Sequence, residues 1–318
     1  MADLKVFARW VAERPGTRLW SAQSTLVDSL QAGAYLAGAG IRVPIGLGVA
    51  LTPMVHPVHA AVQARSLAIL TGHDVWAGFG TGGKDLESGF LGQPYRKPAS
   101  AVGEYLTIAR HAMDGGEFVH DGEQFTVRGG LVSVDSPRVA LGAGVLREGM
   151  ARVAGRTADF VVTWLAPLPH LTDRLIPELA RSATAHGRTM PQIVSMVHLG
   201  PLGVAPGSPE LASYALTPHL WAGHYRSMLR HAGLNSGDSK SPADLAQALV
   251  DERVVLGGDL DAIVDQLVEY RAAGVAEVAL NPLGTHLRHG AGRALADVAA
   301  VYDAYARHTT ETGRRSPE

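Results

Sequence analysis

The chain has 318 residues, 37 of them glycine and none of them cysteine, with 28 basic and 30 acidic residues and a formal charge of −2. No disulfide framework, thiolate metal site or cysteine nucleophile is therefore available, and a near-neutral chain is a poor candidate for binding nucleic acid. Hydrophobic residues make up 46% of the chain, which excludes intrinsic disorder and allows a large packed core.

The sequence also argues against a targeting or membrane segment. Charged residues interrupt 1–16, so this region lacks the apolar run of a signal peptide. The apolar stretch 41–55 is broken by Pro44 and Pro53, and no segment approaches about 18 uninterrupted apolar residues. We therefore expect a cytoplasmic protein without a membrane span.

Short apolar runs alternate along the chain with stretches of helical periodicity, a pattern typical of βα units and a parallel sheet. Seven strands are predicted, at 17–22, 43–50, 74–80, 138–141, 160–164, 192–199 and 277–280. Helices are predicted at 4–13, 26–39, 56–70, 99–113, 146–156, 171–186, 260–273 and 292–307, and a hairpin with an Asp121-Gly122 turn at 118–127. No linker separates two halves, so we expect one α/β domain over 1–318.

The segment 204–242 is a long interruption of this alternation. It contains four prolines and one expected helix, at 218–232. Long connections that follow the strands of an α/β fold often carry lids or specificity. We therefore expect 204–242 to be an insertion that covers a pocket and sets the choice of substrate.

Several predicted strands contain or end in glycines, where the absence of a Cβ lets backbone approach a ligand. VWAGFGTGG at 75–83 leads into a polar stretch, and VALGAGVL at 139–146 leads into a helix whose first amides favour an anion. The first of these also partly matches a dinucleotide-binding fingerprint, through Gly78, Gly80 and Gly83, which is a weak signal by itself. Both stretches equally fit ordinary strand-to-helix turns, so ligand binding stays open at this level.

Four stretches in order resemble the bacterial-luciferase-like oxidoreductases: 45–83, 102–127, 139–162 and 255–282. The first joins IGLGVALTP to an HP pair, a helix and a glycine-ending strand, and the third contains the AG-x-x-AD pattern. The resemblance implies a (β/α)₈ TIM barrel. The chain opens in what looks like the first helix of that barrel, so its first strand is missing here, which we interpret as a start site placed too late.

The resemblance also implies a cofactor, either the deazaflavin coenzyme F420 or FMN, bound in the mouth of the barrel. Many members back the cofactor ring with a non-prolyl cis peptide, which matches Gly48-Val49, and F420-dependent members hold the phosphate end at two further stretches. The cofactor-binding positions implied are Gly48, Val49, Gly78, Phe79, Gly80, Thr81, Gly82, Gly83, Leu141, Gly142, Ala143, Gly144, Val145 and Leu146. We expect F420, with FMN as the alternative.

Two departures from the family pattern bear on the reaction. F420-dependent dehydrogenases of this family carry Asp-His where Gln23 and Ser24 stand here, and an acid where Gly83 stands. Alcohol oxidation needs a base, which these residues do not supply. We therefore expect a reductase that transfers hydride to an activated double bond, for example of a dehydro amino acid in a modified peptide. An FMN-dependent monooxygenase and a non-catalytic homologue are the alternatives.

Further expectations concern contacts and partners. Candidates for catalytic contacts are Gln23, Ser24, Trp164 and His198. No histidine pair has convincing metal-ligand spacing, and His286 and His289 are expected in a polar loop, so no metal is expected. The partners expected are a small-molecule or peptide substrate and a second copy of the chain, in a homodimer formed through the helices at 26–39 and 58–70.

Overall fold

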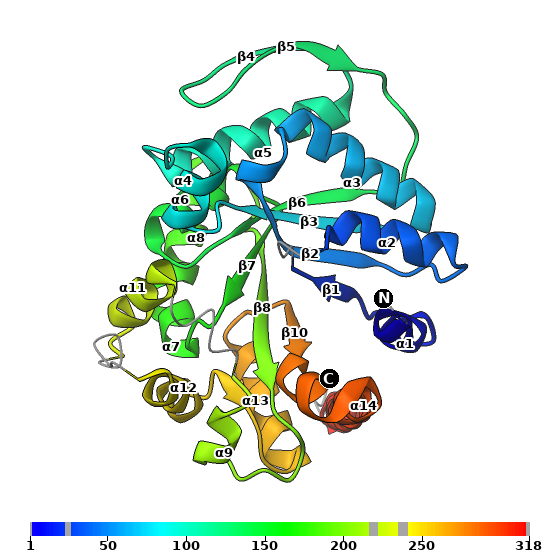
Figure 1. Ribbon diagram of the computed structural model, residues 1–318, viewed down its shortest axis with the longest axis vertical. Coiled ribbons are helices and arrows are strands. Elements are labelled where there is room, and N and C mark those ends of the chain that lie inside the picture. Colours follow the sequence, from blue (N-terminus) through cyan, green and yellow to red (C-terminus); the bar gives the residue numbers. More distant parts are fainter. Residues whose placement is uncertain (1, 23–26, 216–221, 235–240, 316–318) are drawn as a thin grey trace. The chain divides into compact units, whose positions relative to one another are not determined.

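Residues 2–22, 27–215, 222–234 and 241–315 are described by the computed structural model of the protein (Figure 1). The chain divides into two compact units. The first unit comprises Met1–Val162 and Leu175–Gln192, and the second comprises Thr163–Arg174 and Ile193–Glu318.

The first unit is built on parallel strands in the order β1-β2-β3-β6-β7. The strands are β1 (Leu19–Ser21), β2 (Ile45–Leu51), β3 (Val75–Gly80), β6 (Val139–Gly144) and β7 (Phe160–Trp164), whose last two residues belong to the second unit. Because all of them are parallel, their carboxyl ends lie along one edge, where α/β folds bind ligands. The predicted α/β architecture with a parallel sheet is confirmed.

Helices connect these strands. They are α1 (Ala2–Ala12), α2 (Ser29–Gly38), the short 3₁₀ helix η1 (Thr52–Met54), α3 (Pro57–Thr71), α4 (Lys84–Leu91), α5 (Pro98–Asp114), α6 (Glu148–Thr157) and α8 (Ile176–Ala185). Local sequence sets their ends: α3 begins at Pro57, after His56, whose Nδ1 accepts the Val58 N–H at 3.3 Å, and it ends at Gly72, with φ 70°. The helix α4 was not predicted from the sequence.

The predicted hairpin is present but longer, with β4 (Gly116–Asp121) paired to β5 (Thr126–Leu131). Its loop is not an Asp121-Gly122 turn, because four residues separate the strands. The carboxylate of Glu104 on α5 accepts the N–H groups of residues 123, 124 and 125 at 3.0–3.2 Å. The loop therefore folds around a carboxylate rather than closing on two residues.

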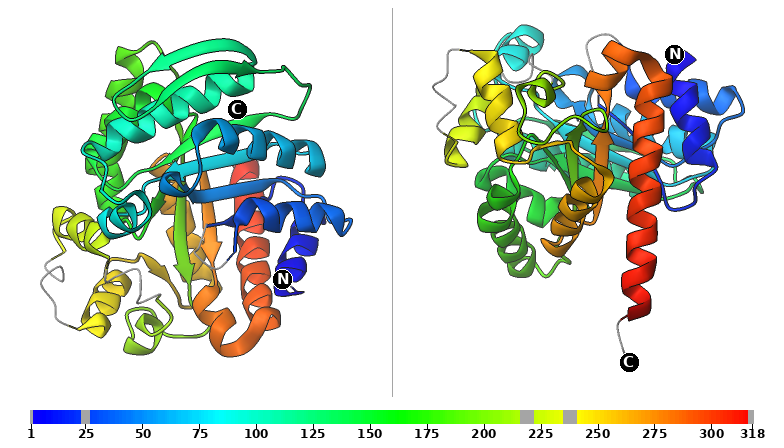
Figure 2. Two further views of the ribbon diagram at one scale, coloured as in Figure 1. Left: turned by 45° about the horizontal axis from the view of Figure 1, so that its top comes forward. Right: turned by 90° about the horizontal axis from the view of Figure 1, so that it is seen from below.

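The second unit contains β8 (Gln192–Leu199), β9 (Val255–Leu256) and β10 (Glu277–Asn281), with β8 paired in parallel to both of the others. Its helical elements are α7 (Leu168–His170), the π turn η2 (Leu171–Leu175), α9 (Pro209–Ala212), α11 (Gly223–His231), α12 (Pro242–Asp251), α13 (Leu260–Ala272) and α14 (Leu283–Arg315). Figure 2 shows a bend near the start of the long helix α14. The bend lies at Gly290, whose backbone is not helical.

Several sequence expectations for the second unit need correction. The strand β9 and the helices α9 and α12 were missed, since each is short or lies within or beside the expected insertion. His286 and His289 lie on α14 and not in a polar loop. The helix expected at 218–232 is α11, and residues 216–221 lie outside the described part of the chain.

The first unit contains an aromatic cluster of the half-buried Trp20 and Trp76 and the buried Phe160. The ring centroids lie 4.9–6.3 Å apart, mostly edge to face. Two neighbouring positions are glycine because these rings fill their side-chain space: a Cβ at Gly46 would lie 2.5 Å from Trp20, and one at Gly142 would overlap the Phe160 ring. Large side chains thus occupy the amino-terminal part of this sheet face.

Candidate functional site

Further along the same sheet face, toward the carboxyl ends of the strands, glycines replace residues with side chains. Alternation along a strand places Gly78 and Gly80 on the face of Trp76. Gly78 pairs with Gly142, which puts Gly142 and Gly144 on that face as well. Gly78, Gly80 and Gly144 therefore present backbone without side chains near the carboxyl end of the sheet, Gly78 and Gly80 being buried and Gly144 half-buried.

The residue that these strands surround is Val49 of β2. The Gly48-Val49 peptide is cis, as the family resemblance led us to expect, and the pairing of β2 with β3 shifts there. A Cβ at Gly80, Gly78 or Gly144 would lie 3.0, 3.2 or 3.4 Å from a Val49 methyl group. Residues up to 95 positions apart in the sequence thus converge on one side chain.

The other candidates on these strands divide by the face on which they lie. Phe79, Leu141 and Ala143 are buried on the opposite face, and the Phe79 ring packs against Tyr105 with centroids 5.0 Å apart. Their side chains therefore pack toward the helices, and only their backbone borders the glycine face. Thr81, Gly82 and Gly83 follow β3 and are partly exposed.

The turn after β6 differs from the sequence expectation. The strand was expected to end at Leu141 and the helix to begin at Leu146, but β6 continues to Gly144 and α6 begins at Glu148. The strand extends because its glycines fit beneath Phe160 and Val49. Val145 donates its N–H to the Val162 carbonyl at 2.8 Å, and the first helical residue is an acid. This helix N-terminus is therefore less suited to an anion than the sequence indicated.

A polar cluster beside β2 was missed by the sequence reasoning. Glu87 on α4 is 1% exposed, and its carboxylate accepts the Tyr95 N–H at 3.1 Å. Burial raises the pKa of Tyr95, the hydroxyl of the buried Thr52 lowers it, and the Glu87 carboxylate raises it. Thr52 follows β2 directly, so this cluster borders the carboxyl end of that strand. The signal was hidden because 84–97 reads as a polar loop.

The remaining catalytic candidates fall in two places. In the second unit, Trp164 and His198 pack edge to face with ring centroids 5.1 Å apart. His198 is 2% exposed, and its β8 position pairs with Asn281 of β10. Gln23 and Ser24 lie outside the described residues.

Metal-binding groups and membrane-spanning helices are both absent from the described residues. They contain no group of three or more histidine, aspartate or glutamate side chains arranged to hold a metal ion. None of the described helices combines the length and apolar character needed to cross a membrane.

The family model of luciferase-like monooxygenases matches residues 7–277. The chain belongs to the luciferase-like monooxygenase family. Curated relatives include an uncharacterized protein of Mycobacterium tuberculosis (Rv0940c), 26% identical over 186 residues. That match covers 58% of this chain and 64% of the relative's length.

Solved structures show that the luciferase-like chain has the expected barrel fold. An F420-dependent secondary alcohol dehydrogenase in complex with an F420-acetone adduct matches with a TM-score of 0.72 at 15% identity, over 94% of this chain and 93% of that one. The coenzyme F420-dependent tetrahydromethanopterin reductase of Methanopyrus kandleri matches with a TM-score of 0.69 at 17% identity, over 92% of both chains. A riboflavin lyase with modified FMN matches with a TM-score of 0.70 at 14% identity, over 98% of this chain and 85% of that one. The predicted luciferase-like TIM-barrel fold is confirmed.

Proposed function

We propose that this luciferase-like protein is a coenzyme F420-dependent reductase that transfers hydride to an activated double bond. Membership in the family supports an oxidoreductase. Two of the similar structures named above are F420-dependent by their descriptions and one holds modified FMN. The FMN-dependent monooxygenase is therefore the second candidate.

The observation that supports a planar cofactor is the glycine-lined sheet face around Val49. Gly78, Gly80 and Gly144 place backbone where side chains would otherwise stand, which fits the close approach of a ring system. Gly82 and Gly83, with φ of 80° and 139°, would lie toward the phosphate end. When bound, reduced F420 would supply the hydride. The protein's residues would hold and orient the cofactor.

The groups along these strands favour reduction of the substrate over oxidation. The stretches 45–51, 75–83 and 139–146 contain no aspartate or glutamate. A base for alcohol oxidation is therefore not supplied by these stretches. Hydride addition instead creates an anion, which hydrogen-bond donors stabilise. We propose Gln23 and Ser24 as such donors, and Trp164 and His198 as contacts to the substrate.

Anaerobic titration with reduced F420 and with reduced FMN tests the cofactor. We expect micromolar binding of F420 and at least about tenfold weaker binding of FMN. Tighter binding of reduced FMN, with oxygen consumption, would assign the protein to the monooxygenases. Binding of neither cofactor would support the non-catalytic homologue.

The variant Gly80→Val tests the placement of the cofactor. Its side chain would enter the space beside Val49, where even a Cβ lies at 3.0 Å, so we expect F420 affinity to fall at least about tenfold. Gly38→Ala is the matched control, because a Cβ there meets nothing within 4 Å. Unchanged affinity in Gly80→Val, in a folded protein, would show that the cofactor binds elsewhere.

We also propose that the insertion 204–242 sets the choice of substrate. Its described parts include α9 and α11. Exchanging the segment with that of a relative should alter which enones, imines or dehydro amino acids are reduced, while F420 affinity stays the same. An unchanged substrate range would contradict this role.

A further inference from the structure

The short helix α9 lies over the carboxyl ends of the strands of the second unit. The strands β8, β9 and β10 are parallel, and a glycine follows each of them within three residues, at Gly200, Gly257 and Gly284. In Figure 1 the arrow of β8 points toward α9. Ligand sites of α/β barrels form at this end of the strands, so the residues that occupy it bear on what the protein can bind.

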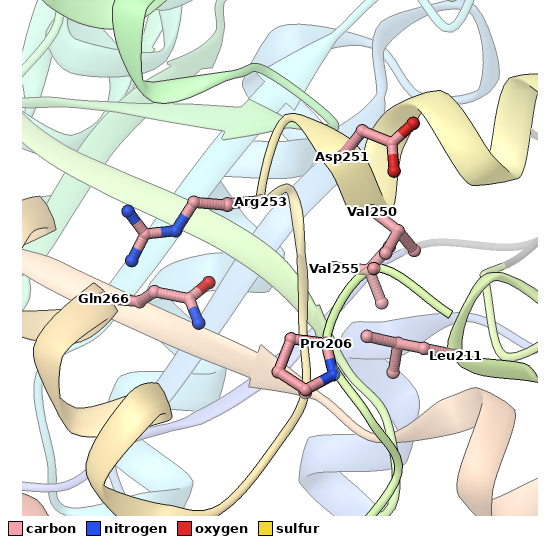
Figure 3. A pocket seen from close by; sticks show the side chains of 9 residues that line it. Pro206, Leu211, Val250, Asp251, Arg253, Val255 and Gln266 are labelled. Carbon is pink, nitrogen blue, oxygen red and sulfur yellow. The ribbon is translucent and has the colours of Figure 1, made fainter. Parts of the chain in front are cut away.

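Leu211 of α9 fills the space over the first two of these glycines. A Cβ at Gly200 or Gly257 would overlap the methyl groups of Leu211, which is 1% exposed. Gly200 also donates its N–H to the Leu256 carbonyl at 2.9 Å, so the ends of β8 and β9 are joined where Leu211 packs. In Figure 3, Leu211 lies on the same side of the adjoining hollow of about 420 Å³ as Val255 of β9. The two glycines therefore leave room for a side chain of the insertion itself.

Tyr214, which follows α9, is held by the start of α14. Its hydroxyl lies 2.9 Å from Nε2 of His289, and the guanidinium carbon of Arg288 lies 4.5 Å from the centroid of its ring. Arg288 also donates to the hydroxyl and the carbonyl of Ser213, at 2.6 and 2.7 Å. A Cβ at Gly284 would overlap the Tyr214 carbonyl. The segment is therefore held by polar contacts to α14 as well as by apolar packing on the strands.

These contacts distinguish α9 from a mobile lid. Segments that open readily have few buried apolar contacts, whereas Leu211, Ala212 and Tyr214 are each less than 7% exposed. The helix also packs against α12, and Gln247 of α12 donates from Nε2 to the Gly207 carbonyl at 2.7 Å. This part of the insertion is therefore packed as core.

We propose that α9 is a fixed cap over the ends of β8, β9 and β10, and that Leu211 and Tyr214 are positioning residues through which the insertion sets the choice of substrate. The effect on substrate choice rests on the proposed reductase function, whereas the cap rests on packing contacts alone. Because Leu211 stands directly on the strand ends, the height of α9 above them limits the room that a substrate has there. A larger residue beneath Leu211 should raise the cap and favour bulkier substrates.

Hydrogen exchange on the full chain tests the cap without any ligand. The amides of residues 211–215 are all hydrogen-bonded within the segment, so their exchange reports the opening of α9. We expect them to be protected at least about a hundredfold before any cofactor or substrate is added. Exchange close to the unprotected rate would show a mobile lid and overturn the proposal, whether or not the chain is a reductase.

A compensating pair of substitutions tests the position of α9. Gly257→Ala places a methyl group in the space of Leu211 and should displace the cap, so that residues 211–215 exchange at least about tenfold faster. Adding Leu211→Val returns the volume of one carbon and should restore slow exchange in part. Gly292→Ala is the matched control, because a Cβ there meets nothing within 4 Å. Additive effects of the two substitutions would contradict the assigned contact.

Substrate choice is measured with reduced F420 and two enones, the small cyclohex-2-enone and the bulkier 4-phenylbut-3-en-2-one. Gly257→Ala should raise the ratio of kcat/KM for the bulky over the small enone about tenfold, through KM and with F420 affinity unchanged. Tyr214→Phe removes only the hydroxyl that meets His289 and should act in the same direction, which keeps the test available where Gly257→Ala does not fold.

Two outcomes separate this proposal from the function on which it rests. An unchanged ratio in a variant whose α9 exchanges faster would overturn the positioning role, while the reductase stands. Failure of the wild-type protein to bind F420 would overturn the reductase and the role in substrate choice with it, and the exchange measurement would still decide the cap.

Discussion

The polar cluster of Thr52, Glu87 and Tyr95 shows how burial changes the chemistry of single residues beside the sheet. Tyr95 is half-buried, and its pKa is raised chiefly because its anion would be poorly solvated. The Thr52 hydroxyl acts in the opposite direction, and the Glu87 carboxylate adds to the rise by repelling a second negative charge. Tyr95 therefore keeps its proton over the whole neutral range.

Substitution at this cluster should move the pKa of Tyr95 in a defined direction. Glu87→Gln removes the negative charge and should lower this pKa, whereas Thr52→Val removes the hydroxyl and should raise it. Ultraviolet titration of tyrosinate, with Tyr95→Phe subtracted, measures the change. A rise in Glu87→Gln, or a fall in Thr52→Val, would contradict the assigned causes.

At the scale of elements, the β4–β5 hairpin is held to α5 by one carboxylate. Glu104 accepts three successive backbone N–H groups, and His120 lies 3.5 Å from the same carboxylate. Phe125, in the loop, packs edge to face on Tyr105 with centroids 5.9 Å apart. Charge-assisted bonds of this kind are stronger than neutral ones, so the loop depends on the charge of Glu104.

Glu104→Gln should therefore loosen the loop. The amide keeps one acceptor oxygen but loses the charge, and we expect a local cost of about 1–3 kcal/mol. Hydrogen exchange at the amides of residues 123–125 measures this opening directly. Glu117→Gln, at an exposed position on β4, is the matched control and should leave exchange unchanged. Equal protection in both variants would show that side-chain packing alone holds the loop.

At the scale of the whole molecule, we propose a homodimer formed through α2 and α3. Tyr35 on α2 and Ile69 and Leu70 on α3 are 42%, 47% and 49% exposed. Ile69 and Leu70 are adjacent in the chain, and contiguous exposed apolar residues mark association surfaces in soluble proteins.

Sedimentation tests this assembly. The wild-type protein should sediment at about twice the chain mass of 33.5 kDa. The double variant Ile69→Glu and Leu70→Glu places charges in the surface and should sediment as a monomer. Val119→Glu, on the exposed hairpin, is the control and should remain dimeric. A monomeric wild-type protein at micromolar concentration would remove the proposal.

The sequence by itself determined the class of the fold and the family. Alternation of apolar runs with helical periods predicts a parallel sheet wherever helices must cross over between strands, and the four stretches in order predicted the family that the comparisons show. Pro57 and Gly72 fix the ends of α3 for local reasons, since proline suits the first turn of a helix and glycine suits the left-handed residue that ends one. The cis peptide at Gly48-Val49 followed from the resemblance and not from the residues alone.

Other features were decided only by the tertiary structure, because they depend on residues that lie far apart in the sequence. Gly142 lies within a strand and not in a turn because the Phe160 ring fills its side-chain space. The hairpin loop has four residues because Glu104 approaches from another helix. Glu87 lies buried because α4 packs against η1, the short helix that follows β2. Local sequence does not encode these positions, since each is set by a side chain that meets the backbone only after the chain has folded.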